Sequence, residues 1–357
     1  MPDHPSPYPT SRDQFSIAII CALTQEADAV EALFDEFYDE TGHDYGKIHG
    51  DPNAYTNGRI GKYHVVLAHM PGMGKGIASS VATSFNASYN NIRLALLVGI
   101  CGGVPRKEDG GEIFLGDVLV SDGLVQYDLG KRFPDRFFRK DTLAESLGRP
   151  NQEIRATLKK EGGGRGKCRW EKRLASYLDV VQNTLSMQKA GYPGTKEDFL
   201  FPSNYRYKHH ELETCSLFHS CQARGDRVCY EALQMHCQAL KCDQTISGAR
   251  TRNSCKIEYP PPAVHIGHIA SGDTVLLSGH DRDEISAKEN IIGFEMEGAG
   301  VWDSIPCIVI KGVSDYADSH KSKRWQDYAS AAAASCMKAF LDNLNVVDHG
   351  MATNSSM

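Results

Sequence analysis

Four acidic side chains follow closely on apolar stretches that have the pattern of buried strands. They are Glu26, Glu295, Glu297 and Asp315. One such acid is usually a helix cap or a solvated residue. Several acids at one edge of a sheet suit the cleavage of a glycosidic bond. One acid can protonate the leaving group while a carboxylate activates water on the opposite face of an oxocarbenium-like transition state.

The elements that must position these acids follow from the spacing of apolar residues. Buried or alternating strands are expected at 15–22, 54–60, 63–70, 94–100, 116–122, 264–271, 291–297 and 306–312. Helical periodicity begins at Thr24 and reaches Phe37, and it recurs at 77–89, 173–187, from Gly298, and at 328–344. A glycine-rich turn is expected at 101–104. Strands that alternate with helices predict an α/β domain with a mixed, largely parallel, twisted central sheet flanked by helices.

This topology predicts where a ligand binds. In doubly wound sheets ligands lie beyond the carboxyl ends of the strands. The rule selects Glu26, the glycines at 72–76, the turn after residue 100, the acids around Met296, and the pair Ser314 and Asp315. A purine base leaves readily once its N7 is protonated, and a buried aspartate with a raised pKa can deliver that proton.

The glycine motif PGMGKG at 71–76 does not match a standard phosphate loop. A P-loop needs Ser or Thr after its lysine, where Gly76 stands, and a dinucleotide fingerprint needs a third glycine, where Ile77 stands. We therefore expect a tight strand-to-helix turn near a pocket.

Length and composition set the domain organisation. The chain has 357 residues, of which 41% are hydrophobic, enough for one large core. We expect a single domain at 15–345, with polar, disordered tails at 1–14 and 346–357. The region 140–260 is rich in charge, cysteine, histidine and glycine, and it is interpreted as a cysteine-rich insertion.

Charge and hydropathy exclude several classes of partner. The net charge of -6 provides no basic field for nucleic acid. No secretory leader is evident, and no apolar run approaches the roughly 20 residues that span a bilayer. We therefore expect a cytoplasmic protein with a small-molecule ligand, and no membrane partner, nucleic acid, cofactor or metal.

The eleven cysteines fall into two groups. Four lie in apolar stretches and are expected to be core residues, and seven lie between Cys168 and Cys255. Histidines near this second group raise zinc as an alternative, but the short Cys-x2-Cys pairs typical of structural zinc are missing. Free thiols are the preferred interpretation; zinc and disulfides remain open.

Several motifs together resemble the superfamily of purine nucleoside phosphorylases and methylthioadenosine nucleosidases. They are ICALTQEADAV, LVGICGGVP with LGDVLVSD, IASGD, FEMEGAG and KGVSDYADSHKSKRWQDYA. The similarity covers about 15–130 and 260–345. The C-terminal motif, together with YPGTKEDFLF, is most similar to a fungal branch of the superfamily. Members of that branch occur alone or as the N-terminal domain of larger immune-receptor-like proteins.

The resemblance implies roles for three acids. Glu26 stands at the position of the water-activating glutamate, and Asp315 at that of the aspartate that bonds N7 and the 6-substituent of the purine. Glu297 stands where ribose hydroxyls are held. These three residues are the expected core of the site.

The resemblance places further residues around the ligand. Met296 is expected beneath sugar and base, Cys101 and Gly102 beside the ligand, and Val275 in a loop over the base. Glu295 and Ser314 complete the predicted binding residues. Lys311 stands where bacterial nucleosidases carry an arginine.

Hydrolysis is expected rather than phosphorolysis. Related phosphorylases place an arginine and a serine where this chain has Leu97 and Ile100, and an apolar pair cannot donate to phosphate. The predicted activity is cleavage of adenosine or a related purine nucleoside to base and ribose by a homodimer. The alternatives are a phosphorylase, a nucleosidase acting on a purine nucleotide with Lys75, Lys131 or Arg132 as cations, and a non-catalytic purine sensor.

Overall fold

The computed structural model describes residues 8–142, 144–211, 215–217, 219–223, 225–246, 248–250 and 260–344. Its core is a nine-stranded mixed sheet in the order β12-β11-β6-β13-β5-β1-β4-β3-β2. The strands are β1 (Ile17–Cys21), β2 (Glu36–Phe37), β3 (Ala54–Ile60), β4 (Tyr63–His69), β5 (Leu94–Gly103), β6 (Val118–Gln126), β11 (Val264–Ser271), β12 (Ile291–Glu295) and β13 (Cys307–Asp315). The α/β fold with a central mixed sheet is therefore confirmed.

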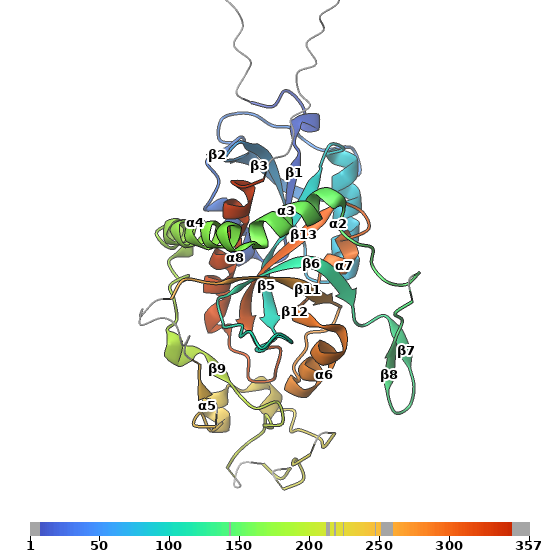
Figure 1. Ribbon diagram of the computed structural model, residues 1–357, viewed down its shortest axis with the longest axis vertical. Helices are drawn as coiled ribbons and strands as arrows, with labels where there is room; N and C mark the ends of the chain where they lie inside the picture. Colours follow the sequence, from blue (N-terminus) through green and yellow to red (C-terminus); the bar gives the residue numbers. More distant parts are fainter. Residues whose placement is uncertain are drawn as a thin grey trace, which may run out of the picture.

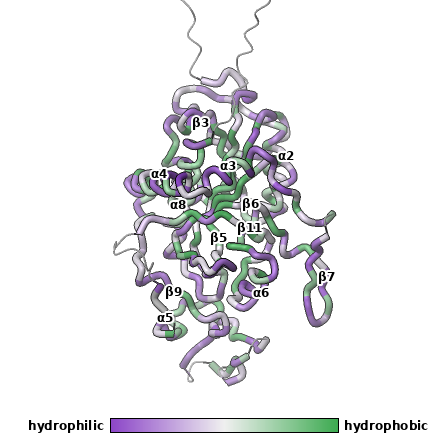
Figure 2. Tube along the Cα trace, in the orientation of Figure 1, coloured by the Kyte–Doolittle hydropathy of each residue, from purple (hydrophilic) through white to green (hydrophobic). Residues whose placement is uncertain are grey.

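Helices surround this sheet (Figure 1). They are α1 (Thr24–Glu31), α2 (Lys75–Ser88), α3 (Gln152–Gly162), α4 (Gly164–Gln182), α5 (Cys237–Leu240), α6 (Gly279–Glu289), α7 (Gly298–Val301) and α8 (Gln326–Leu341). Helix α8 packs on β5 and β13, and α1 and α4 pack on α8. Figure 2 shows the hydrophobic residues concentrated in the central strands and the hydrophilic ones toward the outside.

Part of the sheet closes on itself. Strand β12 pairs with β11 and also, antiparallel, with the end of β5, where Gly293 and Phe294 lie opposite Gly103 and Gly102. The strands β5, β13, β6, β11 and β12 therefore form a ring. This closure corrects the predicted turn at 101–104: residues Cys101 to Gly103 continue β5, because ladders with β13 and β12 hold them on both sides.

Helix α1 is shorter than its apolar periodicity predicts. The helix ends at Glu31, and Glu36–Phe37 forms β2, which pairs with Arg59 and Gly58 of β3. Phe34 and Phe37 stack on each other. Backbone pairing with β3 thus overrides the local helical pattern, which is a tertiary effect.

Part of the segment predicted as an N-terminal tail is described by the structure. Within the supposed tail 1–14, residues Arg12–Gln14 form the 3-10 helix η1, and the Tyr8 hydroxyl donates to Glu36 at 2.7 Å. Residues 1–7 and 345–357 lie outside the described residues. The remaining domain boundaries stay predictions.

The beginning of the predicted insertion is integrated with the core. Trp170 of α4 is fully buried, and its Nε1 donates to the carbonyl oxygen of Cys336 in α8 at 3.0 Å. The region also contains η2 (Leu185–Met187), η3 (Thr195–Glu197), η5 (Ala232–Gln234) and a small sheet of β9 (Phe199–Leu200) with β10 (Gly248–Ala249). A second small sheet, β7 (Gly130–Arg132) with β8 (Phe137–Arg139), lies just before it. Within the described residues, no helix has the length and apolar character needed to cross a bilayer.

Candidate active site

A cavity of about 390 Å³ lies at the carboxyl ends of β1, β5, β12 and β13. The residues predicted to form the site all line it: Glu26, Cys101, Gly102, Val275, Glu295, Met296, Glu297, Ser314 and Asp315. The structure therefore brings together side chains that are as far apart as 289 positions in the sequence, from Glu26 to Asp315. Their individual roles remain predictions.

Glu26 lies in the first turn of α1 and is 2% exposed. Its Oε2 accepts hydrogen bonds from the backbone N–H groups of Ala22 and Leu23, both at 3.0 Å, and its Oε1 accepts one from Ile100 at 2.8 Å. Burial raises the pKa of this carboxyl, and the cation of Lys311 acts in the opposite direction. The backbone of two strand ends thus fixes the orientation of Glu26 at the cavity.

Space for Glu26 depends on the absence of a side chain at Gly99. A Cβ there would lie 2.2 Å from Oε1 of Glu26. We expect Gly99→Ala to push the carboxylate out of place, to destabilise the fold by about 1–3 kcal/mol, the usual cost of overpacking, and to reduce any turnover. Urea unfolding and an activity assay measure both effects.

Gly76→Ala is the matched control for this substitution. Gly76 lies in the first turn of α2, where a new Cβ would meet nothing within 4 Å. Alanine there should leave stability unchanged or raise it by up to about 1 kcal/mol through helix propensity. Equal stabilities of the two variants would contradict the proposed packing at Gly99.

Glu297 and Lys311 form a buried ion pair. Nζ of Lys311 lies 3.0 Å from Oε2 of Glu297, and the two residues are 2% and 5% exposed. Burial would lower the pKa of the ammonium, but Glu297, Glu26 and Glu295 together raise it above its ordinary value. Lys311 therefore stays charged and serves as the shared cation of three buried carboxylates. Sequence reasoning noted Lys311 without giving it a role.

Glu295 is oriented toward the start of α7. Its Oε2 accepts from the N–H groups of Glu297 at 2.9 Å and Gly298 at 2.8 Å. Burial, with a contribution from the neighbouring charge of Glu297, raises the pKa of Glu295. Although Glu295 lines the cavity, these bonds suit a residue that positions Glu297 better than one that binds substrate.

Asp315 is the last residue of β13. Its Oδ1 accepts from the N–H of Ala317 at 2.9 Å, and its Oδ2 lies 3.0 Å from the hydroxyl of Ser314. The same hydroxyl lies 3.2 Å from the carbonyl oxygen of Cys101. A Cβ at Gly102 would lie 2.9 Å from the Cβ of Ala317 and 3.1 Å from Asp315 Oδ1, so a side chain there would displace this turn. Asp315 is thus held by its own turn and by the end of β5.

The remaining predicted residues form the cavity wall. Met296 lies between the two glutamates, and Val275, 43% exposed, comes from the segment between β11 and α6. Sequence reasoning missed Phe294, Met73, Lys321 and Lys323, which also line the cavity. Phe294 immediately precedes Glu295, and Met73 lies within the glycine segment 72–76 that the rule of strand ends selected, so the same rule reaches both.

The three basic residues considered as ligands for a 5'-phosphate lie outside the cavity lining. Lys75 pairs with Asp128 and Asp273, while Lys131 and Arg132 lie in β7; none of the three lines the cavity. The predicted strand-to-helix turn at 71–76 is present, since β4 ends at His69 and α2 begins at Lys75.

Two known proteins are similar to this chain over most of its length. An NLR-like protein of Hyaloscypha variabilis is 29% identical over 335 residues, which is 92% of this chain and 29% of that protein. A 5'-methylthioadenosine/S-adenosylhomocysteine nucleosidase of Mycobacterium bovis is 21% identical over 337 residues, 93% of this chain and 98% of the relative.

Solved structures have the same fold. The 5'-methylthioadenosine/S-adenosyl homocysteine nucleosidase of Helicobacter pylori gives a TM-score of 0.53 at 16% identity, covering 93% of this chain and 99% of the other. The futalosine hydrolase of the same organism gives 0.52 at 16% identity, covering 94% and 100%. The model of the phosphorylase superfamily matches residues 16–235, more than half of the chain. The chain therefore belongs to the phosphorylase superfamily.

Proposed function

We propose that this chain is a purine nucleosidase that hydrolyses the N-glycosidic bond of adenosine or a related purine nucleoside. The observation that carries the proposal is the meeting of Glu26, Glu297 and Asp315, from three separate elements, at one cavity of about 390 Å³. A volume of this order suits a small-molecule ligand. The nucleosidases among the relatives support the same reaction class.

In this proposal Glu26 activates the attacking water. A carboxylate can accept about four hydrogen bonds, and three backbone N–H groups use three of these positions. The remaining capacity can accept a proton from water. Because both oxygens are held by the backbone, the group is oriented before substrate binds, which reduces the reorganisation needed in the transition state.

Glu297 and Asp315 would hold the two halves of the substrate. Lys311 donates a hydrogen bond to Oε2 of Glu297. Oε1 of Glu297 accepts no hydrogen bond from the described residues, so this oxygen can accept hydrogen bonds from ribose hydroxyls. Asp315, when protonated, can donate to N7 and stabilise the departing base. Val275 and Phe294 would provide apolar contacts to the base and sugar.

Water is the proposed nucleophile because positions 97 and 100 provide no side-chain hydrogen-bond donors for phosphate. Leu97 is buried in the core at 1% exposed, and Ile100, whose side chain is apolar, lines the cavity. The N–H of Ile100 is already bound by Glu26. Neither position can supply charge-assisted bonds to phosphate.

An assay of base release with and without phosphate tests the proposal. Purified protein should release free purine and ribose from adenosine at the same rate in phosphate-free buffer as in phosphate. A strict requirement for phosphate, with ribose 1-phosphate as product, would identify a phosphorylase. Binding of purine nucleosides with no release of base would favour the sensor.

A nucleotide substrate is the second candidate, and one observation favours it. Lys321 and Lys323, which precede α8, line the same cavity and can neutralise 5'-phosphates. AMP and ATP therefore belong in the same assay, with kcat/KM compared against adenosine. The predicted homodimer remains a proposal, which the molar mass in solution tests.

A further inference from the structure

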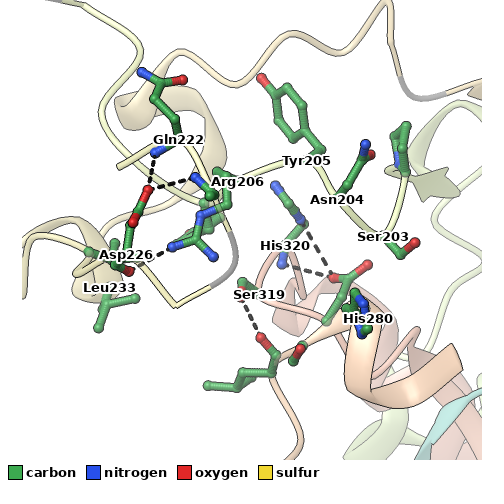
Figure 3. A pocket seen from close by; sticks show the side chains of 18 residues that line it. Ser203, Asn204, Tyr205, Arg206, Gln222, Asp226, Leu233, His280, Ser319 and His320 are labelled. Carbon is green, nitrogen blue, oxygen red and sulfur yellow. Dashed lines mark hydrogen bonds and ion pairs between the residues drawn. The ribbon is translucent and has the colours of Figure 1, made fainter. Parts of the chain in front are cut away.

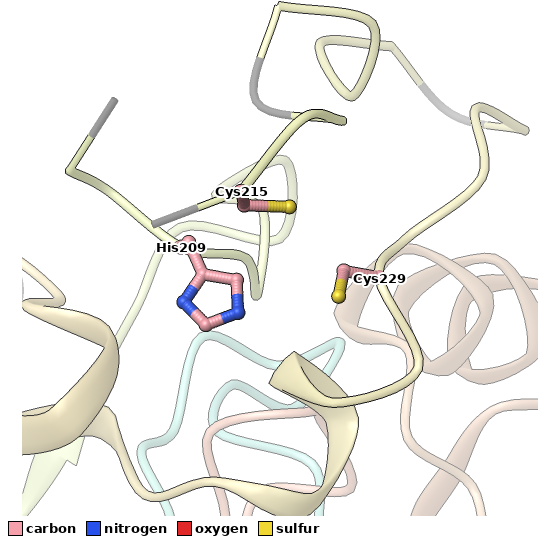
Figure 4. Close-up of side chains that lie close together, drawn as sticks. All are labelled: His209, Cys215 and Cys229. Atoms are coloured by element: carbon pink, nitrogen blue, oxygen red, sulfur yellow. The ribbon is translucent and has the colours of Figure 1, made fainter. Parts of the chain in front are cut away.

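Three potential metal ligands meet outside the candidate active site. His209, Cys215 and Cys229 come from separate turns of the chain, and their ligand atoms all lie within 4.8 Å of one another. Figure 4 shows the two sulfurs on the same side of the His209 ring. Their sequence spacings, five and thirteen intervening residues, are not the short pairs that usually identify such a site.

The histidine of this cluster is buried without a partner for one ring nitrogen. His209 is 6% exposed, and within the described residues its Nε2 has no hydrogen-bond partner. A buried polar atom without a partner is destabilising, so such atoms are rare in folded proteins. A bound cation at the cluster would give the imidazole a partner and remove this cost.

We propose that His209, Cys215 and Cys229 bind a zinc ion. Two thiolates and one neutral imidazole are the donor set that zinc prefers, whereas Mg²⁺ and Ca²⁺ select oxygen. Donor atoms on tetrahedral zinc stand about 3.5–3.8 Å apart, as follows from Zn–S and Zn–N bond lengths. The three side chains therefore need to move by about 1 Å or less. Binding releases two thiol protons to solvent, and the two thiolates balance the charge of the ion.

The described residues provide three ligands, which leaves the fourth zinc position to water or to another donor.

The zinc would order a segment that reaches the candidate active site. His210, next to His209, stacks its ring on that of Tyr205, with the ring centroids 5.1 Å apart. The ring centroids of Tyr205 and His320 are 5.3 Å apart. Tyr205 and His320 line a second cavity, of about 530 Å³ (Figure 3). Burial lowers the pKa of His320 to about 4, so this contact is one between neutral rings at physiological pH. His320 directly precedes Lys321, which lines the candidate active site. The zinc ion would therefore help to position this part of the site and would take no part in the reaction.

Metal analysis of the full chain tests the proposal independently of any catalytic activity. The protein is purified under reducing conditions, incubated with equimolar Zn²⁺ and desalted. We expect about one zinc per chain, and at least about tenfold less in Cys215→Ser and Cys229→Ser, since each loses a thiolate ligand. Cys168→Ser, at an exposed cysteine of α4, is the matched control and should keep its zinc.

Two further measurements keep the test decisive if a variant folds poorly. Removal of the metal from the wild-type chain by a chelator should speed tryptic cleavage at Arg206 and Arg227, which lie near the cluster in sequence, and leave Lys338 in α8 protected. Alkylation and mass analysis of the unreduced protein detect a Cys215–Cys229 disulfide. Wild-type protein without zinc, or a disulfide in place of two free thiols, would overturn the proposal.

Discussion

Replacement of Glu26 by glutamine is expected to lower turnover by about two orders of magnitude or more while ligand binding is retained, the usual scale for a lost acid/base group. Glutamine has the same shape but cannot take a proton from water. Its amide NH2 must also face either the N–H of Ile100 or those of Ala22 and Leu23, because the carboxylate accepts from both sides. Part of the loss will therefore come from reorientation of the side chain.

Glu31→Gln is the control for this variant. Glu31 lies on the same helix α1 and contacts the Thr56 hydroxyl at 2.9 Å, and it does not line the cavity. Its turnover should match that of the wild type. Initial rates of base release and calorimetric titration with the free base measure the two quantities. A Glu26→Gln enzyme with wild-type turnover would move the catalytic base to another residue.

Replacement of Lys311 by methionine is expected to destabilise the protein by about 3–5 kcal/mol, because it removes one partner of a buried ion pair. Glu297 would lose its 3.0 Å contact, and Glu26 and Glu295 would lose the cation that they share with it. Methionine fills a similar volume, so the loss measures charge more than packing. Urea unfolding gives the change in the free energy of unfolding.

The same substitution should change the dependence of activity on pH. Glu26 acts as a base only when ionised, so activity falls as the pH drops through its pKa. Burial places that pKa above the ordinary value of 4.5, and Lys311 lowers it. Without the cation the pKa rises further, so the acid limb of the kcat/KM profile should move to higher pH. An unmoved acid limb would show that Glu26 is not the group being titrated.

Lys167→Met separates the effect of burial from the loss of any lysine. Lys167 pairs with Glu171 on the surface of α4 at 3.7 Å and is 42% exposed. An exposed pair contributes about 0–1 kcal/mol, so this variant should unfold almost as the wild type does. A loss at Lys311 that is no larger than this would contradict the role of Lys311 as the shared cation.

Strand ends could be predicted because their signal is local. The apolar stretch at 15–22 predicts β1, and the apolar stretches before Glu295 and Asp315 predict β12 and β13. Parallel strands place their carboxyl ends at one edge of a sheet. This rule accounts for Glu26 and Asp315, because β1 and β13 both run parallel to β5. Strand β12 runs antiparallel to β5, so the acids after it reach the cavity because the sheet closes on itself.

Features that depend on distant partners could not be predicted in this way. The end of α1 is set by the pairing of Glu36 with Arg59, and the path of Cys101 to Gly103 by two neighbouring strands. Neither pairing can be detected from the hydrophobic periodicity of the segment itself. The three ligands of the proposed zinc site escape a spacing rule for the same reason.

The sequence by itself determined the alternation of strands and helices, the order of the elements and the identity of the acids at the strand ends, because each depends on hydrophobic periodicity over a few residues. Only the tertiary structure decided which oxygens of Glu26 and Glu295 are held by backbone N–H groups, which carboxylate pairs with Lys311, and that β12 returns to close on β5. The contacts of Glu26 with Ile100 and of β12 with β5 join segments more than 70 residues apart, and those of Glu295 and Lys311 depend on how buried side chains are oriented. A local pattern carries no information about contacts of that kind.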